Sequence, residues 1–171
     1  MEAVVALVVC GVSGAGKSTV GGLLAQQLGW DFFDADDFHP PANVAKMRGD
    51  EPLTDEDRGP WLDALHALIE RHAAEGRRLV LACSALKEAY RARLGIDQQR
   101  VISVFLDGSK SLLAARLAKR THTFMPASLL DSQLEALEVP RDGIRIAIDT
   151  TPETAVQRIL AAIEGPSTRP E

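Results

Sequence analysis

Cysteine is scarce in this chain of 171 residues, and both cysteines lie in apolar segments. Cys10 ends the run VVALVVC and Cys83 ends the run LVLAC. Because both runs have the pattern of a buried strand, we expect each thiol to be a small core residue. This placement disfavours a disulfide or a cysteine-bound metal, and it fits a reducing cytoplasm.

Long apolar runs and an excess of basic charge are also missing. No apolar run approaches the roughly 20 residues that a helix needs to span a bilayer, and no basic segment of a signal peptide precedes the first apolar run. The net charge of −5 argues against general nucleic-acid binding. The guanine-reading sequence N-K-x-D is absent, which disfavours a GTPase. We expect a cytoplasmic protein with neither membrane nor nucleic acid as a partner.

The most informative segment present is GVSGAGKST, residues 11–19, which has the spacing G-x-x-x-x-G-K-S of a phosphate-binding loop. Its glycines allow a tight turn that points backbone N–H groups at one anion, and a helix beginning near Lys17 adds its positive dipole end. Lys17 suits the outer phosphates, and the Ser18 hydroxyl suits Mg²⁺. The expected nucleotide-binding residues are Gly11, Ser13, Gly14, Ala15, Gly16, Lys17, Ser18 and Thr19.

The sequence around this loop supports the interpretation. Residues 4–10 have the β-branched, apolar character of a buried strand. Val20, Leu24 and Leu28 then follow at helical spacing, and Gly29 is a helix-stop signal. Strand, glycine loop and helix are the arrangement that phosphate binding requires. The alternative, a glycine-rich turn that binds nothing, is disfavoured by this context.

Strand and helix patterns alternate along the whole chain, which predicts an α/β fold with a mainly parallel sheet. We expect a single domain over residues 1–164 and a disordered tail over residues 165–171. The expected strands are residues 4–10, 32–33, 79–83, 101–106 and 144–148. The expected helices follow Lys17, Pro40, Thr54 or Asp55, Ser84, Ser109, Ser128 and Thr151.

Acidic residues cluster directly after the short strand at Phe32 and Phe33. Asp34, Asp36 and Asp37 would lie beyond the carboxyl end of that strand, where ligands of parallel sheets bind. Asp34 is therefore a candidate partner of Mg²⁺. A solvated acidic turn remains the alternative.

Basic residues follow two later elements. Ser84 and Lys87 come just past a strand end, and Lys87, Arg91 and Arg93 recur on the helix expected there, where a solvated basic face is the alternative. Further along, Arg116 and Arg120 lie one helical turn apart. The polar stretch that follows, residues 121–126, is broken by proline and is placed where a lid would lie.

Three longer segments resemble the gluconokinase family. They are HPPANVAKMRGDEPLTDEDRGPWL at 39–62, CSALKEAYR at 83–91 and LLDSQLEALE at 129–138. Together with the phosphate loop, the resemblance covers residues 7–152. It implies ATP-dependent phosphorylation of D-gluconate at its 6-hydroxyl, which feeds the pentose phosphate or Entner–Doudoroff routes. It also implies a homodimer and a core like that of shikimate and nucleoside monophosphate kinases, with five parallel strands, flanking helices and a lid at about residues 120–128.

The same resemblance assigns roles. Asp34 would assist Mg²⁺, Asp36 would hold and deprotonate the substrate hydroxyl, Arg116 would stack on adenine, and Arg120 would reach the phosphates when the lid closes. The polar positions expected to line the sugar-acid pocket are His39, Lys46, Arg58, Ser84, Lys87 and Arg91, together with Asp36.

One departure concerns the lid. The family usually has G-H-F there, whereas this chain has His122-Thr123-Phe124, which leaves a role for His122 open. Two alternative functions remain at this stage. One is a kinase for another small polyol, sugar acid or shikimate-like compound, and the other is a non-catalytic nucleotide-binding module.

Overall fold

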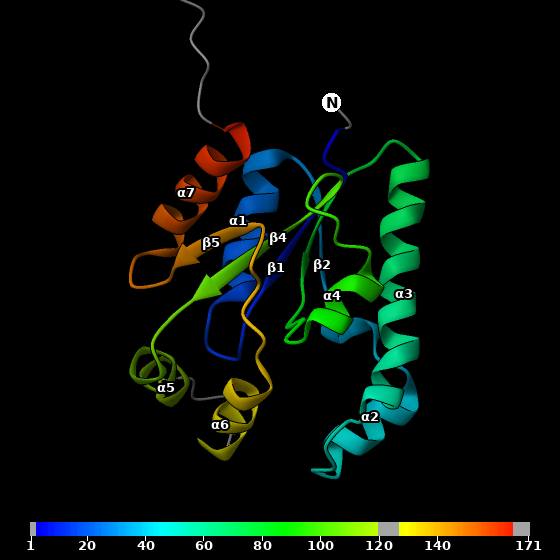
Figure 1. Cartoon of the computed structure of the whole chain (residues 1–171), viewed down its shortest axis with the longest axis vertical. Coiled ribbons are helices and arrows are strands. Elements are labelled where there is room, and N and C mark those ends of the chain that lie inside the picture. Colours follow the sequence, from blue (N-terminus) through cyan, green and yellow to red (C-terminus); the bar gives the residue numbers. More distant parts are fainter. Residues whose placement is uncertain (1–2, 120–126, 166–171) are drawn as a thin grey trace, which may run out of the picture.

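A five-stranded parallel sheet lies between two groups of helices in the computed structural model, which describes residues 3–119 and 127–165 (Figure 1). The strands lie in the order β2-β3-β1-β4-β5, and each neighbouring pair is parallel. The predicted α/β fold with a parallel sheet is confirmed. The strands are β1 (Ala6–Cys10), β2 (Asp31–Asp34), β3 (Leu79–Ala82), β4 (Val101–Asp107) and β5 (Ile144–Ala147).

Three of the longer helices begin at residues with a capping side chain. The hydroxyls of Thr54, Ser109 and Thr151 each accept a backbone N–H of the first turn that follows. No helix in the described ranges is long and apolar enough to cross a membrane. The helices are α1 (Lys17–Leu28), α2 (Pro41–Arg48), α3 (Asp55–Ala74), α4 (Glu88–Leu94), α5 (Lys110–Ala118), α6 (Ala127–Ala136) and α7 (Pro152–Glu164), and a 3₁₀ helix, η1 (Ala35–Phe38), follows β2.

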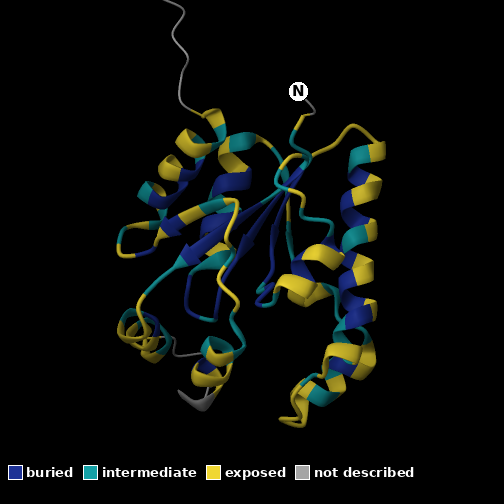
Figure 2. Ribbon diagram, viewed as in Figure 1, coloured by how far each residue is buried: buried dark blue, intermediate teal, exposed yellow. Residues whose placement is uncertain are grey.

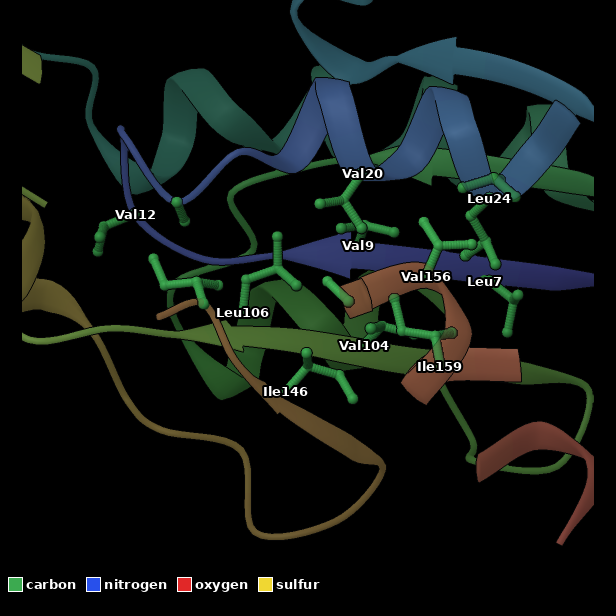
Figure 3. Packing of buried hydrophobic residues seen from close by; sticks show 14 of the residues in the cluster. Leu7, Val9, Val12, Val20, Leu24, Val104, Leu106, Ile146, Val156 and Ile159 are labelled. Carbon is green, nitrogen blue, oxygen red and sulfur yellow. The ribbon is translucent and has the colours of Figure 1, made fainter. Parts of the chain in front are cut away.

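The sheet has a hydrophobic core on each face because successive side chains of a strand point to opposite sides. Leu7 and Val9 of β1 pack with residues of α1 and α7, such as Leu24 and Ile159 (Figure 3). Val8 belongs to the other core, with residues of α3 and α4. Burial on both faces explains the continuous apolar runs of the central strands, which are dark blue in Figure 2.

The two cysteines are free and buried, as the sequence predicted. Cys10 ends β1 and Cys83 follows β3, and both belong to the core on the α3 and α4 face of the sheet. Burial raises the pKa of each thiol to about 12. The thiols therefore stay protonated at neutral pH and act as packing groups.

One helix is shorter than the sequence predicted. Residues 84–87 form a loop, and α4 begins only at Glu88. Ala85 has φ +41°, a backbone conformation that cannot continue a helix, and Lys87 is the extended N-cap. Lys87 therefore does not share a helix face with Arg91. It lies at the carboxyl edge of the sheet, in what we call the acceptor loop (residues 84–87).

Candidate active site

The phosphate loop joins β1 to α1 at the carboxyl edge of the sheet. Gly14 and Gly16 have φ +87° and +90°, which residues with side chains rarely adopt. A Cβ at Gly14 would lie 3.0 Å from Cγ of Leu117, so α5 leaves no space for a larger residue. No side chain caps the first turn of α1, and a bound anion can therefore take the place of a cap.

Lys17 lies across the loop that precedes it. Its Nζ donates a hydrogen bond to the Val12 carbonyl oxygen at 3.0 Å. This contact holds the Lys17 ammonium group against the backbone of the phosphate loop, near the N–H groups of the loop. A charge in this position is suited to the outer phosphates of a nucleotide.

Ser18 and Asp34 meet beside the phosphate loop, as a metal site would require. The Ser18 hydroxyl donates to Asp34 Oδ2 at 2.7 Å, although the two residues come from different elements, α1 and β2. Among the described residues there is no group of three or more acidic, histidine or cysteine side chains that could enclose a metal. One hydroxyl and one carboxylate fit Mg²⁺, which usually completes its shell with phosphate oxygens and water.

Asp36 lies on η1 and is held by the same carboxylate. Its backbone N–H donates to Asp34 Oδ1 at 3.0 Å. Although the residue is exposed, desolvation by the surrounding protein and, next, the negative charge of Asp34 raise the pKa of Asp36, whereas His39 and, less strongly, Lys17 lower it. Since Asp34 accepts hydrogen bonds from both Ser18 and the backbone of Asp36, the acidic cluster lies beside the end of the phosphate loop.

An open pocket lies on the other side of the phosphate loop. Its cavity volume is about 190 Å³, and the pocket opens to solvent. Arg116 of α5 lines the pocket, and its Nη2 donates to the Ile148 carbonyl oxygen. This bond fixes the guanidinium plane at the pocket wall, where Arg116 could stack on a base. The other lining residues are Gly14, Ala15, Gly16, Thr19, Val20, Thr150, Thr151, Pro152 and Ala155.

His39 follows η1 and lies against α3. Its ring stacks on Trp61 with a centroid distance of 4.3 Å and an interplanar angle of 12°. The Asn43 amide lies 3.2 Å from His39 Nδ1, and the Trp61 indole N–H donates to the Ala35 carbonyl oxygen at 2.7 Å. Burial, and next the charge of Arg58, lower the pKa of His39, whereas Asp36 raises it. The imidazole is therefore a neutral hydrogen-bonding group at pH 7.

Arg58 and Lys87 lie around one tyrosine. The Arg58 guanidinium and the Lys87 ammonium each lie 5.5 Å from the centroid of the Tyr90 ring. The Tyr90 hydroxyl donates to Asp55 Oδ1, and Lys87 Nζ lies 3.3 Å from the same oxygen. The cluster brings together α3, the acceptor loop and α4, and places two cations around the same aromatic ring.

The remaining three predicted pocket residues have different surroundings. The Ser84 carbonyl oxygen accepts the Gly11 N–H at 3.3 Å, which places the acceptor loop beside the phosphate loop. Lys46 Nζ lies 2.8 Å from Asp57 Oδ2, and this contact lowers the pKa of Asp57 to about 2. Arg91 is buried, and its guanidinium donates to two backbone carbonyl oxygens. These contacts favour a structural role for Arg91 over the expected contact with substrate.

Known proteins resemble this chain over nearly its whole length. The shikimate kinase family matches residues 13–164. The gluconokinase of Gluconobacter oxydans is 47% identical over 157 residues, which cover 90% of this chain and 88% of that protein. The crystal structure of a gluconokinase from Sinorhizobium meliloti 1021 has a TM-score of 0.84 and 41% identity, covering 94% of this chain and 91% of that chain.

The chain belongs to the gluconokinase family. The shikimate kinase of Aquifex aeolicus, with a TM-score of 0.58 and 20% identity over 94% of this chain and 96% of that chain, shares the fold alone. The predicted resemblance to gluconokinases and the predicted P-loop kinase fold are thus confirmed.

Some expectations for this gluconokinase family member lie outside the described residues. These are Arg120, the sequence His122-Thr123-Phe124 and the tail from residue 166. Most of the segment expected to form a lid, residues 120–126, lies there too. The helix expected from Ser128 begins one residue earlier, as α6.

Several residues that shape the site were not predicted individually. Asn43, Asp55, Trp61 and Tyr90 lie within two of the three gluconokinase-like segments, but a polar or aromatic residue on a helix does not reveal which partner it meets. Gln133 is also new to the site, because its amide contacts Ser13 of the phosphate loop. Thr150 lies after the end of β5 and lines the open pocket, and no local sequence pattern marks it.

Proposed function

We propose that this member of the gluconokinase family transfers the terminal phosphoryl group of ATP to the 6-hydroxyl of D-gluconate, forming 6-phosphogluconate and ADP. The observation that carries the proposal is the shared position of the phosphate loop and the Asp34–Asp36 pair at one edge of the sheet. The gluconokinase relatives, which match nearly the whole chain, support the choice of acceptor.

The reaction replaces one bond to phosphorus by another. The acceptor oxygen attacks the terminal phosphorus in line, the bond to the oxygen that bridges to ADP breaks, and the hydroxyl proton passes to Asp36 or to water. The transition state of such transfers is loose, so positioning and charge neutralisation provide most of the rate enhancement. Lys17 and the loop N–H groups stabilise the phosphate charge, and ionised Asp36 orients the hydroxyl.

Mg²⁺ is the metal that we propose for this site. Ser18 and Asp34 would hold it, directly or through water, together with phosphate oxygens. When bound, the ion neutralises negative charge on the transferring phosphoryl group. Asp34 also holds the backbone of Asp36, so one carboxylate serves both the metal side and the acceptor side of the site.

Gluconate brings a carboxylate that needs a cationic partner. Arg58 and Lys87 supply two cations around Tyr90, and we propose that they bind this group. His39 directly follows η1, the short helix that carries Asp36. Its neutral imidazole suits a hydrogen bond to a sugar hydroxyl. The Ser84 hydroxyl, in the acceptor loop, is a further candidate.

A panel of acceptors tests the function. ADP formation is measured with gluconate, other aldonates, polyols and shikimate at equal concentrations. We expect kcat/KM for gluconate to exceed that for every other compound. Preference for shikimate or another acid would replace the proposed substrate but keep the kinase, whereas ATP binding without turnover on any acceptor would indicate a nucleotide-binding module.

Two further properties are proposed from the family resemblance: a homodimer and a cytoplasmic location. Light scattering coupled to size exclusion distinguishes a dimer from a monomer of 18.4 kDa. The buried, free cysteines suit a reducing compartment. A monomer at enzyme concentrations used for turnover would reject the dimer.

A further inference from the structure

The helix α6 and the turn after it contact both loops of the site, although no role has been assigned to them above. On one side, Gln133 makes two hydrogen bonds to Ser13 of the phosphate loop. Gln133 Oε1 accepts the Ser13 N–H at 2.7 Å, and its Nε2 donates to Ser13 Oγ at 3.0 Å. A side-chain amide that pairs with both the backbone and the hydroxyl of one loop residue fixes its position.

The residue Glu138, just after α6, contacts the other loop. Its backbone N–H donates to the Leu86 carbonyl oxygen at 2.8 Å, and its Oε1 accepts the Glu88 N–H at 2.8 Å. The second contact caps α4, whose own N-cap, Lys87, provides no side-chain cap. Glu138 therefore fixes the loop that carries Lys87 from both sides.

Arg91 strengthens this junction from inside. Its Nη1 donates to the Ala85 carbonyl oxygen and its Nη2 to the Glu138 carbonyl oxygen, both at 2.8 Å. Ala85 is the residue with positive φ, so this guanidinium holds the strained part of the acceptor loop against the turn after α6. The role of Arg91 in this site is thus to lock the loop.

Helix α6 is packed into the hydrophobic core and can therefore transmit a displacement between the phosphate loop and the acceptor loop. Leu130 is buried in the core that also contains Val12 and Ala15 of the phosphate loop, and Leu137 packs against both cores. We propose that Gln133 and Glu138 are positioning residues through which nucleotide binding and acceptor binding are coupled. This inference rests on the proposed function, since it concerns the same two substrates.

The two loops also touch directly, through the Gly11 N–H and the Ser84 carbonyl oxygen. Because that contact is made by the backbone, side-chain substitutions leave it intact. Gln133 and Glu138 are the side chains at which the coupling can be changed separately. Coupling of two sites is reciprocal for binding, so a change at the phosphate loop should also alter affinity for the acceptor.

The experiment uses the full chain and a non-hydrolysable ATP analogue, titrated calorimetrically with and without saturating gluconate. The wild type should bind the analogue several-fold more tightly when gluconate is present. Gln133→Met keeps the length of the side chain but removes both hydrogen bonds. It should weaken analogue binding by about tenfold and bring the ratio with and without gluconate close to one. It should also raise KM for gluconate, although Gln133 does not contact the acceptor loop.

Glu138→Ala and Glu138→Gln form the second pair. Glu138→Ala should raise KM for gluconate and weaken analogue binding, whereas Glu138→Gln retains an oxygen for the Glu88 N–H and should restore both constants. Glu135→Gln, at an exposed position of α6, is the matched control and should behave as the wild type. If the role of these residues were purely structural, their substitution would lower Tm and the fraction of active enzyme but leave KM for ATP and KM for gluconate unchanged.

The outcomes separate the two proposals. If the wild type does not phosphorylate gluconate, the proposed function is rejected. If the wild type is active but gluconate leaves analogue affinity unchanged, or if Gln133→Met and Glu138→Ala retain both KM values, the inference alone is overturned. Tighter analogue binding by Gln133→Met would also overturn it, because the amide would then compete with the nucleotide.

Discussion

The nucleotide side and the acceptor side of the site are built in different ways. The nucleotide side is mostly backbone from one continuous stretch, in which Gly14 and Gly16 adopt positive φ and α1 begins at Lys17. The acceptor side is made of side chains from η1, α2, α3, the acceptor loop and α4. There, Arg58 of α3 and Lys87 of the acceptor loop both lie around the ring of Tyr90 from α4.

This difference separates phosphate binding, which every P-loop kinase needs, from selection of the acceptor, which is particular to one kinase. A backbone cradle reads phosphate charge and tolerates changes in nearby side chains. An arrangement of side chains from several elements can change its ligand by single substitutions while the sheet remains the same. Apart from the coupling residues Gln133 and Glu138, substitutions on one side should therefore alter mainly the kinetic constants of the substrate bound there.

The largest expected effect is at the boundary between the two sides. Asp36→Asn should reduce kcat by about 10²- to 10⁴-fold, because the amide can neither accept the hydroxyl proton nor orient the hydroxyl with a full charge. Affinity for a non-hydrolysable ATP analogue should stay within about twofold, since the phosphate loop is unchanged. Single-turnover kinetics and calorimetry measure the two quantities.

The matched control is the neighbouring Asp37→Asn on the same 3₁₀ helix, which should keep kcat near the wild-type value. Unchanged kcat in Asp36→Asn would remove this carboxylate from the mechanism. Loss of analogue affinity together with kcat would mean that the two sides are not separable at this position.

The same difference explains how much the sequence could predict. The phosphate loop, the buried strands and the caps at Thr54, Ser109 and Thr151 follow from local patterns, and each is present in the structure. Local sequence was sufficient there because it sets the backbone conformation. The acidic residues after β2 could be placed at the carboxyl edge of the sheet for a similar reason, because all strands of a parallel sheet end at that edge.

The acceptor side was predicted less completely because its contacts join distant parts of the chain. Arg91 looked like a substrate ligand, but its guanidinium reaches the carbonyl oxygens of Ala85 and Glu138 instead. An alanine gives no signal that it will adopt positive φ, so the break between the acceptor loop and α4 could not be predicted. The link from Gln133 to Ser13 spans 120 positions and has no local pattern.

A smaller effect is expected for a cation of the acceptor side. Lys87→Met keeps the length of the side chain but removes its charge, and KM for gluconate should rise by about tenfold, as expected for loss of one charge-assisted hydrogen bond. KM for ATP should not change. Steady-state kinetics with each substrate varied in turn measure both constants.

Lys110→Met is the control for this substitution. Lys110 is also a lysine in an exposed ion pair, with Asp131 at 2.7 Å, but it lies on α5, away from the acceptor loop. Exposed ion pairs contribute little, so its kinetics should match the wild type. Equal changes in both KM values for Lys87→Met would contradict an acceptor-side role for this lysine.

The smallest expected effect is a change in pH dependence. The folded protein raises the pKa of Asp36 above its ordinary value of 3.8, through desolvation, then Asp34, and least of all Asp37. If the ionised carboxylate is the active form, kcat/KM falls as pH decreases through this raised pKa. Asp37→Asn removes one negative charge that disfavours ionisation of Asp36, so the acid limb of the pH profile should move to lower pH.

The control is Asp63→Asn, which changes an exposed carboxylate on α3 and should leave the acid limb in place. A shift of the limb to higher pH in Asp37→Asn would mean that another group controls it, and Asp36 would then have to act through position alone.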